Sequence, residues 1–143
     1  MNDLFVRICN HEDLEQLASL NKQLIEDEEH DNKMNLEQLK ERMKSFMNTG
    51  YKAYFFLEQN DVKGYALVDH ERKPLYLRQF FICRENRRQG YGRLAFNKLT
   101  AFLSTQELDI EVMFWNERGY RFWKSLGFTE RSIYMRLENV IKE

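Results

Sequence analysis

The sequence predicts a mixed α/β fold in one domain with a mostly antiparallel central sheet, and two observations lead to this prediction. Three apolar segments, 51–58, 62–69 and 75–83, follow one another with only short polar turns between them, as antiparallel hairpins do. Later in the chain an apolar segment, an amphipathic helix and a second apolar segment alternate. That order favours a parallel strand pair joined by a right-handed crossover. A length of 143 residues suits a single domain.

The first third of the chain predicts one strand followed by two helices. Residues 5–9 form a short apolar strand, and a helix begins after it with Asn10 or Asp13 as its cap. Apolar residues recur at helical spacing in 14–25 and again in 36–47. Each of these helices is therefore expected to bury one stripe of side chains.

The remainder of the chain alternates strands and helices. The strand 75–83 is dense in apolar residues, which predicts a central place in the sheet. A helix is expected at 91–103, a strand at 108–115, a helix at 117–126 and a final strand at 128–137. The predicted order is therefore β-α-α-β-β-β-α-β-α-β.

The composition argues against several classes of protein. Hydrophobic residues make up 43% and aromatic residues 14%, too much for a disordered chain. A net charge of −1, from 22 basic and 23 acidic residues, argues against nucleic-acid binding. No apolar run predicts a membrane span, and the N-terminus lacks the pattern of a signal peptide. Cys9 and Cys83 match no metal-ligand spacing, which favours reduced thiols in a cytoplasmic protein without a bound metal.

The sharpest chemical signal lies between the strand 75–83 and the helix that follows it. A helix start leaves backbone N–H groups without partners, and these groups attract an anion together with the helix dipole. Gly90 and Gly92 lack a Cβ, so phosphate oxygens can approach the main chain closely. The pattern matches neither the phosphate loop that ends in Gly-Lys-Ser/Thr nor the dinucleotide loop with three glycines. We expect an anion site here, with a turn that carries solvated arginines as the alternative. The arginines that add charge are Arg87, Arg88 and Arg93.

Two motifs resemble the GNAT (Gcn5-related) N-acetyltransferases. Arg87-x-x-Gly90-x-Gly92 matches the family pattern Q/R-x-x-G-x-G/A, and residues 116–128 (NERGYRFWKSLGF) resemble its segment N-x-x-A-x-x-x-Y-x-x-x-G-F. Residues 134–137 are similar to the family's last strand, and the order of elements agrees over nearly the whole chain. The resemblance implies a single N-acetyltransferase domain over 1–143, with helices on both faces of the sheet and a splayed parallel strand pair.

The resemblance also implies acetyl-CoA or another acyl-CoA as co-substrate, with no metal. The splayed strand would pair its main chain with the pantetheine arm, and the glycine loop would donate N–H groups to the pyrophosphate. Asn116 would hydrogen-bond the pantetheine arm, although it equally fits a helix N-cap. Residues 80–82 also fit ordinary core packing. The expected cofactor-binding residues are Phe80, Phe81, Ile82, Arg87, Arg88, Gln89, Gly90, Tyr91, Gly92, Arg93, Asn116 and Trp123.

The implied reaction is direct attack of a neutral amine on the thioester carbonyl, with a backbone N–H near Ile82 as an oxyanion donor. The family's usual general acid is a Tyr seven residues after the Asn, and Trp123 stands at that position. An indole N–H cannot donate a proton near neutral pH, so Tyr120 is the nearest substitute and water the alternative. Glu111 and Glu29 are the candidate bases, with His30 as a further possible proton acceptor.

By the resemblance, acceptor specificity comes largely from the first two helices and the segment that joins them. The acidic run 26–31 in that segment could attract a cationic amine or form only a solvated helix end. Arg78 and Gln79 are polar residues inside an apolar strand, where alternation places Arg78 with Phe80 and Gln79 with Phe81. Arg78 would suit an acidic group on the acceptor, or would pair with a carboxylate such as Glu111. The expected acceptor-binding residues are Glu26, Glu29, His30, Arg78 and Gln79.

The sequence thus predicts an acyl-CoA-dependent N-acyltransferase. Its acceptor would be a small-molecule amine or the amine of a peptide or protein, with no nucleic acid and no membrane as partners. A homodimer is a further expectation, since dimers are common in folds of this type. The alternative function is a non-catalytic module that binds or senses acyl-CoA, and Trp123 gives that alternative its weight.

Overall fold

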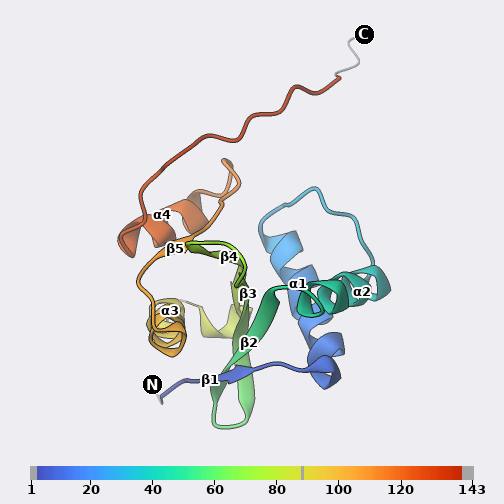
Figure 1. Ribbon diagram of the computed structural model, residues 1–143, viewed down its shortest axis with the longest axis vertical. Helices are drawn as coiled ribbons and strands as arrows, with labels where there is room; N and C mark the ends of the chain where they lie inside the picture. The colour runs from blue at the N-terminus through green and yellow to red at the C-terminus, as the bar shows by residue number, and fades with distance from the viewer. Residues whose placement is uncertain (1–2, 88, 140–143) are drawn as a thin grey trace. The chain divides into compact units, whose positions relative to one another are not determined.

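The computed structural model describes residues 3–87 and 89–139 (Figure 1). The chain forms two compact units, Met1–Met113 and Phe114–Glu143. The first unit holds a five-stranded sheet in the order β1-β2-β3-β4-β5. Its elements are β1 (Phe5–Ile8), η1 (His11–Asp13), α1 (Leu14–Asp27), α2 (Leu36–Met47), β2 (Tyr51–Glu58), β3 (Asp61–Asp69), β4 (Leu75–Ile82), η2 (Arg84–Asn86), α3 (Tyr91–Leu103) and β5 (Leu108–Asp109).

The sheet confirms the predicted mixture of antiparallel and parallel pairs. Strands β1 to β4 pair antiparallel in sequence order, while β4 and β5 pair parallel. The parallel pair is short: it matches Leu75 with Leu108 and Tyr76 with Asp109. Beyond Tyr76, the edge of β4 that faces β5 has no pairing strand within the described residues. This opening in the sheet matters for the candidate site.

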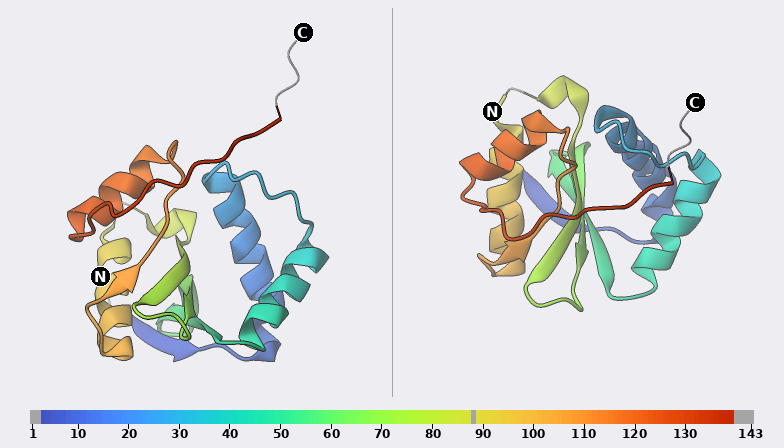
Figure 2. Two further views of the ribbon diagram at one scale, coloured as in Figure 1. Left: turned by 45° about the horizontal axis from the view of Figure 1, so that its top comes forward. Right: turned by 90° about the horizontal axis from the view of Figure 1, so that it is seen from above.

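Helices cover both faces of the sheet in the first unit. Helices α1 and α2 lie on one face and α3 lies on the other (Figure 2, right). The helix region that begins with η1 and α1 is capped by Asn10, whose side chain accepts the N–H of Glu12 (2.8 Å), while Asp13 accepts the N–H of Asn10 (2.9 Å). Of the two predicted caps, Asn10 therefore makes the side-chain cap.

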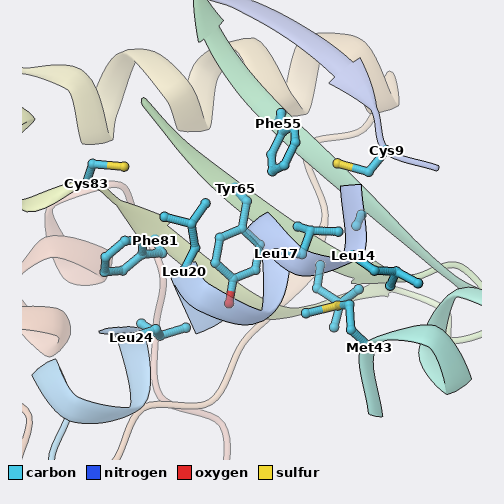
Figure 3. Close-up of a cluster of buried hydrophobic side chains, with 12 residues drawn as sticks. Cys9, Leu14, Leu17, Leu20, Leu24, Met43, Phe55, Tyr65, Phe81 and Cys83 are labelled. Atoms are coloured by element: carbon cyan, nitrogen blue, oxygen red, sulfur yellow. The ribbon is translucent and has the colours of Figure 1, made fainter. Parts of the chain in front are cut away.

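The main core fills the space between the sheet and the helices α1 and α2 (Figure 3). Tyr65 of β3 is fully buried there, and Leu17 of α1 and Met43 of α2 pack in the same cluster. On the other face Phe80 packs against Phe96 of α3, with ring centroids 6.4 Å apart. Burial of aromatic and aliphatic side chains on both faces holds β3 and β4 as a rigid support.

The structure of the second unit differs from the strand predicted at the end of the chain. It contains α4 (Glu117–Ser125), but none of the described residues 126–139 is in a helix or strand. The predicted strand 128–137 is therefore wrong, and the predicted strand 108–115 shortens to β5. An apolar pattern makes a strand only when a neighbouring strand can pair with it. Here the side chains of Ile133 and Leu137 are 85% and 100% exposed.

Two further expectations concern the thiols and the membrane. Cys9 and Cys83 are buried and unbonded to each other, as expected for reduced thiols. In the part of the chain that the structure describes, no helix has both the length and the apolar character needed to cross a membrane.

Candidate functional site

The glycine loop sits at the start of α3, on the structure's first unit. Gly90 has φ 80°, in the left-handed region that glycine enters without steric cost, and this turn allows the helix to begin at Tyr91. The first backbone bond into the helix runs from the N–H of Leu94 to the carbonyl of Gly90 (3.1 Å). The N–H groups of Tyr91 and Gly92 therefore have no acceptor inside their own helix. Unpaired amides at a helix start are the kind of group that attracts an anion.

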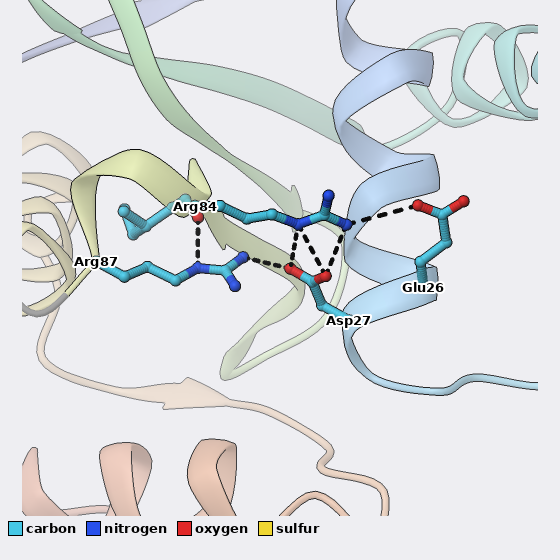
Figure 4. A network of polar contacts seen from close by, with 5 residues as sticks. Glu26, Asp27, Arg84 and Arg87 are labelled. Carbon is cyan, nitrogen blue, oxygen red and sulfur yellow. Dashed lines mark hydrogen bonds and ion pairs between the residues drawn. The ribbon is translucent and has the colours of Figure 1, made fainter.

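An ionic clasp holds this loop to the end of α1 (Figure 4). Asp27 lies between two guanidinium groups: Arg84 contacts it at 2.8 Å and Arg87 at 2.6 Å. Arg87 also donates Nε to the carbonyl of Ile82 (2.9 Å). Burial alone would raise the pKa of Asp27, but the hydrogen bonds from Arg84 and Arg87 outweigh it, so that pKa is lowered. The arginine that opens the motif is thus engaged in shaping the loop.

The other described residues of the loop are anchored to neighbouring elements or exposed. The phenol of Tyr91 is anchored to the end of β2, where it donates to Glu58 (2.8 Å). Gln89 is exposed and its side-chain amide donates to the carbonyl of Glu85 (3.3 Å). Arg93 is exposed on the first turn of α3. Arg88 lies outside the described residues.

The strand β4, which has an open edge, comes just before the loop in the chain. The N–H of Cys83 donates to the carbonyl of Lys63 (2.9 Å) on the β3 side. Because antiparallel strands alternate the direction of their amides, Phe81 also turns its main chain toward β3, and Phe80 and Ile82 turn theirs away. The contact from Arg87 to the carbonyl of Ile82 fits this alternation. Of the predicted pantetheine-binding residues, Phe80 and Ile82 therefore turn main-chain groups toward an edge that no described strand covers, while Phe81 faces β3.

A bulge in β4 changes the predicted direction of Arg78. Leu77 pairs with Val68 and Gln79 pairs with Leu67, so Arg78 has no partner in the register. Strict alternation predicts Arg78 on the face of Phe80, and that prediction is wrong. Arg78 instead lies on the α2 side, where its guanidinium donates to the hydroxyl of Tyr51 (3.2 Å). A bulge inserts one extra residue and so breaks the two-residue period.

A buried polar chain lies next to this bulge, and sequence reasoning missed most of it. Gln79 accepts a hydrogen bond from the hydroxyl of the fully buried Tyr65 (2.7 Å). Asn21 of α1 is also buried, and its side chain accepts from Arg42 of α2 (3.2 Å). One signal could have found it, because Asn21 stands four residues after Leu17, on the buried stripe of α1. A polar residue on such a stripe needs a buried partner.

The acidic run after α1 is divided between the clasp and a loop. Glu26 approaches Arg84 at 3.5 Å, on the clasp. Glu29 is exposed with φ 51°, and His30 uses Nδ1 to accept the N–H of Asn32 (3.1 Å). Within the described residues no hydrogen bond or ion pair joins Glu29 or His30 to Arg78 or Gln79. Of the expected acceptor-binding residues, Arg78 and Gln79 are neighbours in β4 with different partners, and neither Glu29 nor His30 joins them.

Glu111, a candidate base, follows β5 and is exposed. The structure shows no ion pair between Glu111 and Arg78 in the first unit, so the pairing alternative for Arg78 is wrong. The charge of Glu111 does reach Tyr76, whose pKa is raised first by burial and then by that charge.

The second unit holds the remaining predicted residues on or beside α4. Asn116 caps the helix, since its side chain accepts the N–H of Gly119 (3.0 Å). Tyr120 is exposed and donates its hydroxyl to Glu130, which also pairs with Lys124 at 2.7 Å. Trp123 packs against Phe128 with ring centroids 5.4 Å apart. Among the described residues, no cluster of His, Cys, Asp or Glu is arranged to hold a metal ion.

The fold and the site define a class: an α/β protein in which a glycine-initiated helix follows a strand with an open edge. The acetyltransferase (GNAT) domain model matches residues 6–141, and the chain belongs to this family. No curated protein sequence matches the chain.

Solved structures share the fold at low sequence identity. A possible acetyltransferase from Clostridium difficile 630 has a TM-score of 0.76 at 18% identity, over 99% of this chain and 100% of that one. A predicted acetyltransferase with acetyl-CoA from Clostridium acetobutylicum has a TM-score of 0.71 at 15% identity, over 94% and 96%. An aminoglycoside acetyltransferase from an uncultured soil metagenomic sample, in complex with sisomicin, has a TM-score of 0.64 at 17% identity, over 97% of both chains.

Proposed function

We propose that this chain is an acyl-CoA-dependent N-acyltransferase, which transfers acetyl from acetyl-CoA to a primary amine within a ternary complex. One observation carries the proposal: the open start of α3 at Tyr91 and Gly92 adjoins the uncovered edge of β4 at Phe80 and Ile82. A diphosphate needs the first feature, and the amides of a pantetheine arm need the second. The proposal treats residues 1–143 as one catalytic domain.

The chemistry follows from where these main-chain groups lie. The amine nitrogen attacks the thioester carbonyl carbon, and the C–S bond breaks. The amine gives up a proton to a base of the protein or to water, and the leaving thiolate takes a proton from an acid of the protein or from water. Ile82 turns its N–H toward the open edge of β4. This amide suits the developing oxyanion, because a preformed donor stabilises that charge without reorganising.

The proton acid is assigned to Tyr120 or to water. The hydrogen bond to Glu130 raises the pKa of Tyr120, so its phenol must first leave that carboxylate to act as an acid. Water suffices for a thiolate whose conjugate thiol has a pKa of about 8.5. Tyr120→Phe decides between them. Slower turnover at unchanged acetyl-CoA affinity assigns the acid to Tyr120, and an unaltered rate assigns it to water. Glu111 and Glu29 remain the candidate bases.

The acceptor class is supported by the solved relatives. The soil acetyltransferase was solved with sisomicin, and AAC(6')-Iy was solved with the bisubstrate analog CoA-S-monomethyl-acetylneamine. We place this chain's acceptor among small-molecule amines, with a peptide or protein amine as the alternative.

The second candidate function is a non-catalytic module that binds acyl-CoA. Trp123 favours it, because it replaces the expected proton donor. Two measurements separate the functions: thermal unfolding with acetyl-CoA, and release of free thiol from acetyl-CoA with a panel of amines. At a ligand concentration of 100 times Kd, binding should stabilise the protein by about 2.7 kcal/mol. Stabilisation together with thiol release supports the N-acyltransferase. Stabilisation without thiol release supports the non-catalytic module. A chain that shows neither contradicts both.

A further inference from the structure

Two arginines from different elements meet on the α2 side of the sheet. The guanidinium of Arg42 lies 5.5 Å from the ring centroid of Phe46, and that of Arg78 lies 4.9 Å from the same centroid. Arg78 is also 5.9 Å from the ring of Tyr51, which itself packs on Phe46 at 4.6 Å. Two positively charged guanidinium groups therefore lie against the same aromatic side chains. We call Arg42, Phe46, Tyr51 and Arg78 the arginine platform.

The platform has no negative charge of its own. Within the described part of the first unit, neither Arg42 nor Arg78 makes an ion pair with a carboxylate. Their hydrogen bonds go to neutral groups, the side chain of Asn21 (3.2 Å) and the hydroxyl of Tyr51 (3.2 Å). Two neighbouring cations without an anion repel each other, and an anion placed between them relieves that repulsion.

A buried, unpaired donor on Arg42 is the second observation that points to a ligand at the platform. The side chain of Arg42 is half-buried, and its Nε is a buried atom with no hydrogen-bond partner. A buried donor left unpaired is costly, so proteins rarely retain one without a use. Burial first and the charge of Arg78 second lower the pKa of Arg42.

The platform lies close to the proposed reaction centre. Arg78 is the bulged residue of β4, and Ile82 is four residues farther along the same strand. Strand residues advance about 3.3 Å each, so the two positions are separated by roughly 13 Å of backbone. A small acceptor can therefore place its amine near the thioester carbonyl while another group reaches the platform. Glu26 and Asp27, at the end of α1, are engaged by Arg84.

We infer that the acceptor is an amine that also carries a carboxylate, and that Arg42 and Arg78 bind this carboxylate. The inference rests on the proposed function, whose acceptor class it narrows. Guanidinium groups suit carboxylates because their planar N–H forks can bond both oxygens. An acceptor with an amine at one end and a carboxylate at the other would be oriented along β4 toward the open edge.

The test compares matched acceptors with acetyl-CoA in the full chain. The probes are ω-amino acids with two to six carbons, the methyl ester of each, and an aminoalkyl phosphate of similar length. Free-thiol release gives kcat/KM for each probe. A carboxylate held by charge-assisted hydrogen bonds should favour the acid over its ester by roughly tenfold or more for at least one length. An ester used as well as its acid at every length overturns the inference. A phosphate preferred over every acid overturns the assignment to a carboxylate.

Variants tie the preference to the platform. Arg42→Gln and Arg78→Gln should each reduce the preference for the acid by about tenfold, while the thermal shift with acetyl-CoA persists. Lys40→Gln removes a positive charge from the same helix and is expected to keep the preference. If the preference survives in both arginine variants, the platform is not the site.

A further arm separates this inference from the proposed function. Thermal unfolding is measured with the N-acetylated form of the preferred ω-amino acid, without acetyl-CoA, in the wild type and in Arg78→Gln. If acetyl-CoA neither binds nor reacts, the proposed function fails. Stabilisation of the wild type alone by the N-acetyl acid still supports the anion site, and equal shifts in both proteins overturn it.

Discussion

At the scale of single residues, Asp27 is the least expected participant. Sequence patterns place it in an acidic run at a helix end, where a carboxylate most often faces solvent. The structure turns it toward Arg84 and Arg87, which are 57 and 60 positions away in the chain, and its side chain is 15% exposed. Periodicity describes neighbours along one element, so a pair formed across elements leaves no local signal. The motif arginine Arg87 could be predicted, but its partner could not.

Asp27→Asn should therefore weaken the clasp and lower stability at neutral pH. The paired arginines lose a charged acceptor, and the expected loss in free energy of unfolding is roughly 1 kcal/mol, since part of the pair is screened by solvent. Because the folded pKa of Asp27 is lowered, its contribution exists above the unfolded value of about 3.9 and is lost as pH falls through the folded pKa. Urea unfolding at pH 7 and at pH 3 measures it.

The control for this variant is Glu26→Gln, which removes a longer and more exposed contact to Arg84. It should change the free energy of unfolding by less than about 0.5 kcal/mol. A difference between wild type and Asp27→Asn that is the same at pH 3 and pH 7 would contradict the ionic account of the clasp.

At the scale of elements, the sequence predicts what depends on local periodicity. The helices α1, α2 and α3 and the strands β2 and β4 were expected within a residue or two of their observed bounds. The wrong predictions concern features that depend on which strand pairs with which. The bulge at Arg78 and the missing strand after Phe128 both depend on which strand lies alongside, and an alternation of apolar residues says nothing of that.

The close approach of β3 and β4 gives a prediction at this scale. A Cβ on Gly64 would collide with the carbonyl of Phe81 and crowd Ile82 on the neighbouring strand. Because the nearest obstacle is backbone, Gly64→Ala must push the strands apart, and we expect a loss of about 1–3 kcal/mol in stability. Thermal or urea unfolding measures the loss. Gly50→Ala is the matched control, because its Cβ meets only the flexible side chain of Glu71. Equal stability of the two variants would contradict the packing account.

At the scale of the whole molecule, the fold survives while the sequence varies. Residues 6–141 match one family, yet a structure with a TM-score of 0.76 shares only 18% of its residues with this chain. At such low identity the comparison shows that the fold is shared. The resemblance therefore predicted the fold and the glycine loop, whereas the arginine platform needed the three-dimensional structure.

The whole-molecule charge adds one constraint. A net charge of −1 provides little long-range attraction for an anionic ligand. Any affinity for a diphosphate must then come from local groups, chiefly the amides at Tyr91 and Gly92 and the cations around them. The affinity for a diphosphate therefore depends chiefly on the start of α3.

The most direct test is the affinity of acetyl-CoA for the wild type and for Gly90→Glu, measured by calorimetry with Gly127→Ala as the control. Gly90 and Gly127 both have positive φ, so both substitutions strain the backbone, but only the first adds a side chain and a negative charge at the start of α3. We predict that Gly90→Glu remains folded and loses at least about tenfold in affinity, a change of 1.4 kcal/mol or more. Gly127→Ala should keep wild-type affinity. Equal affinity in Gly90→Glu and the wild type would contradict the assignment of the diphosphate to this helix start.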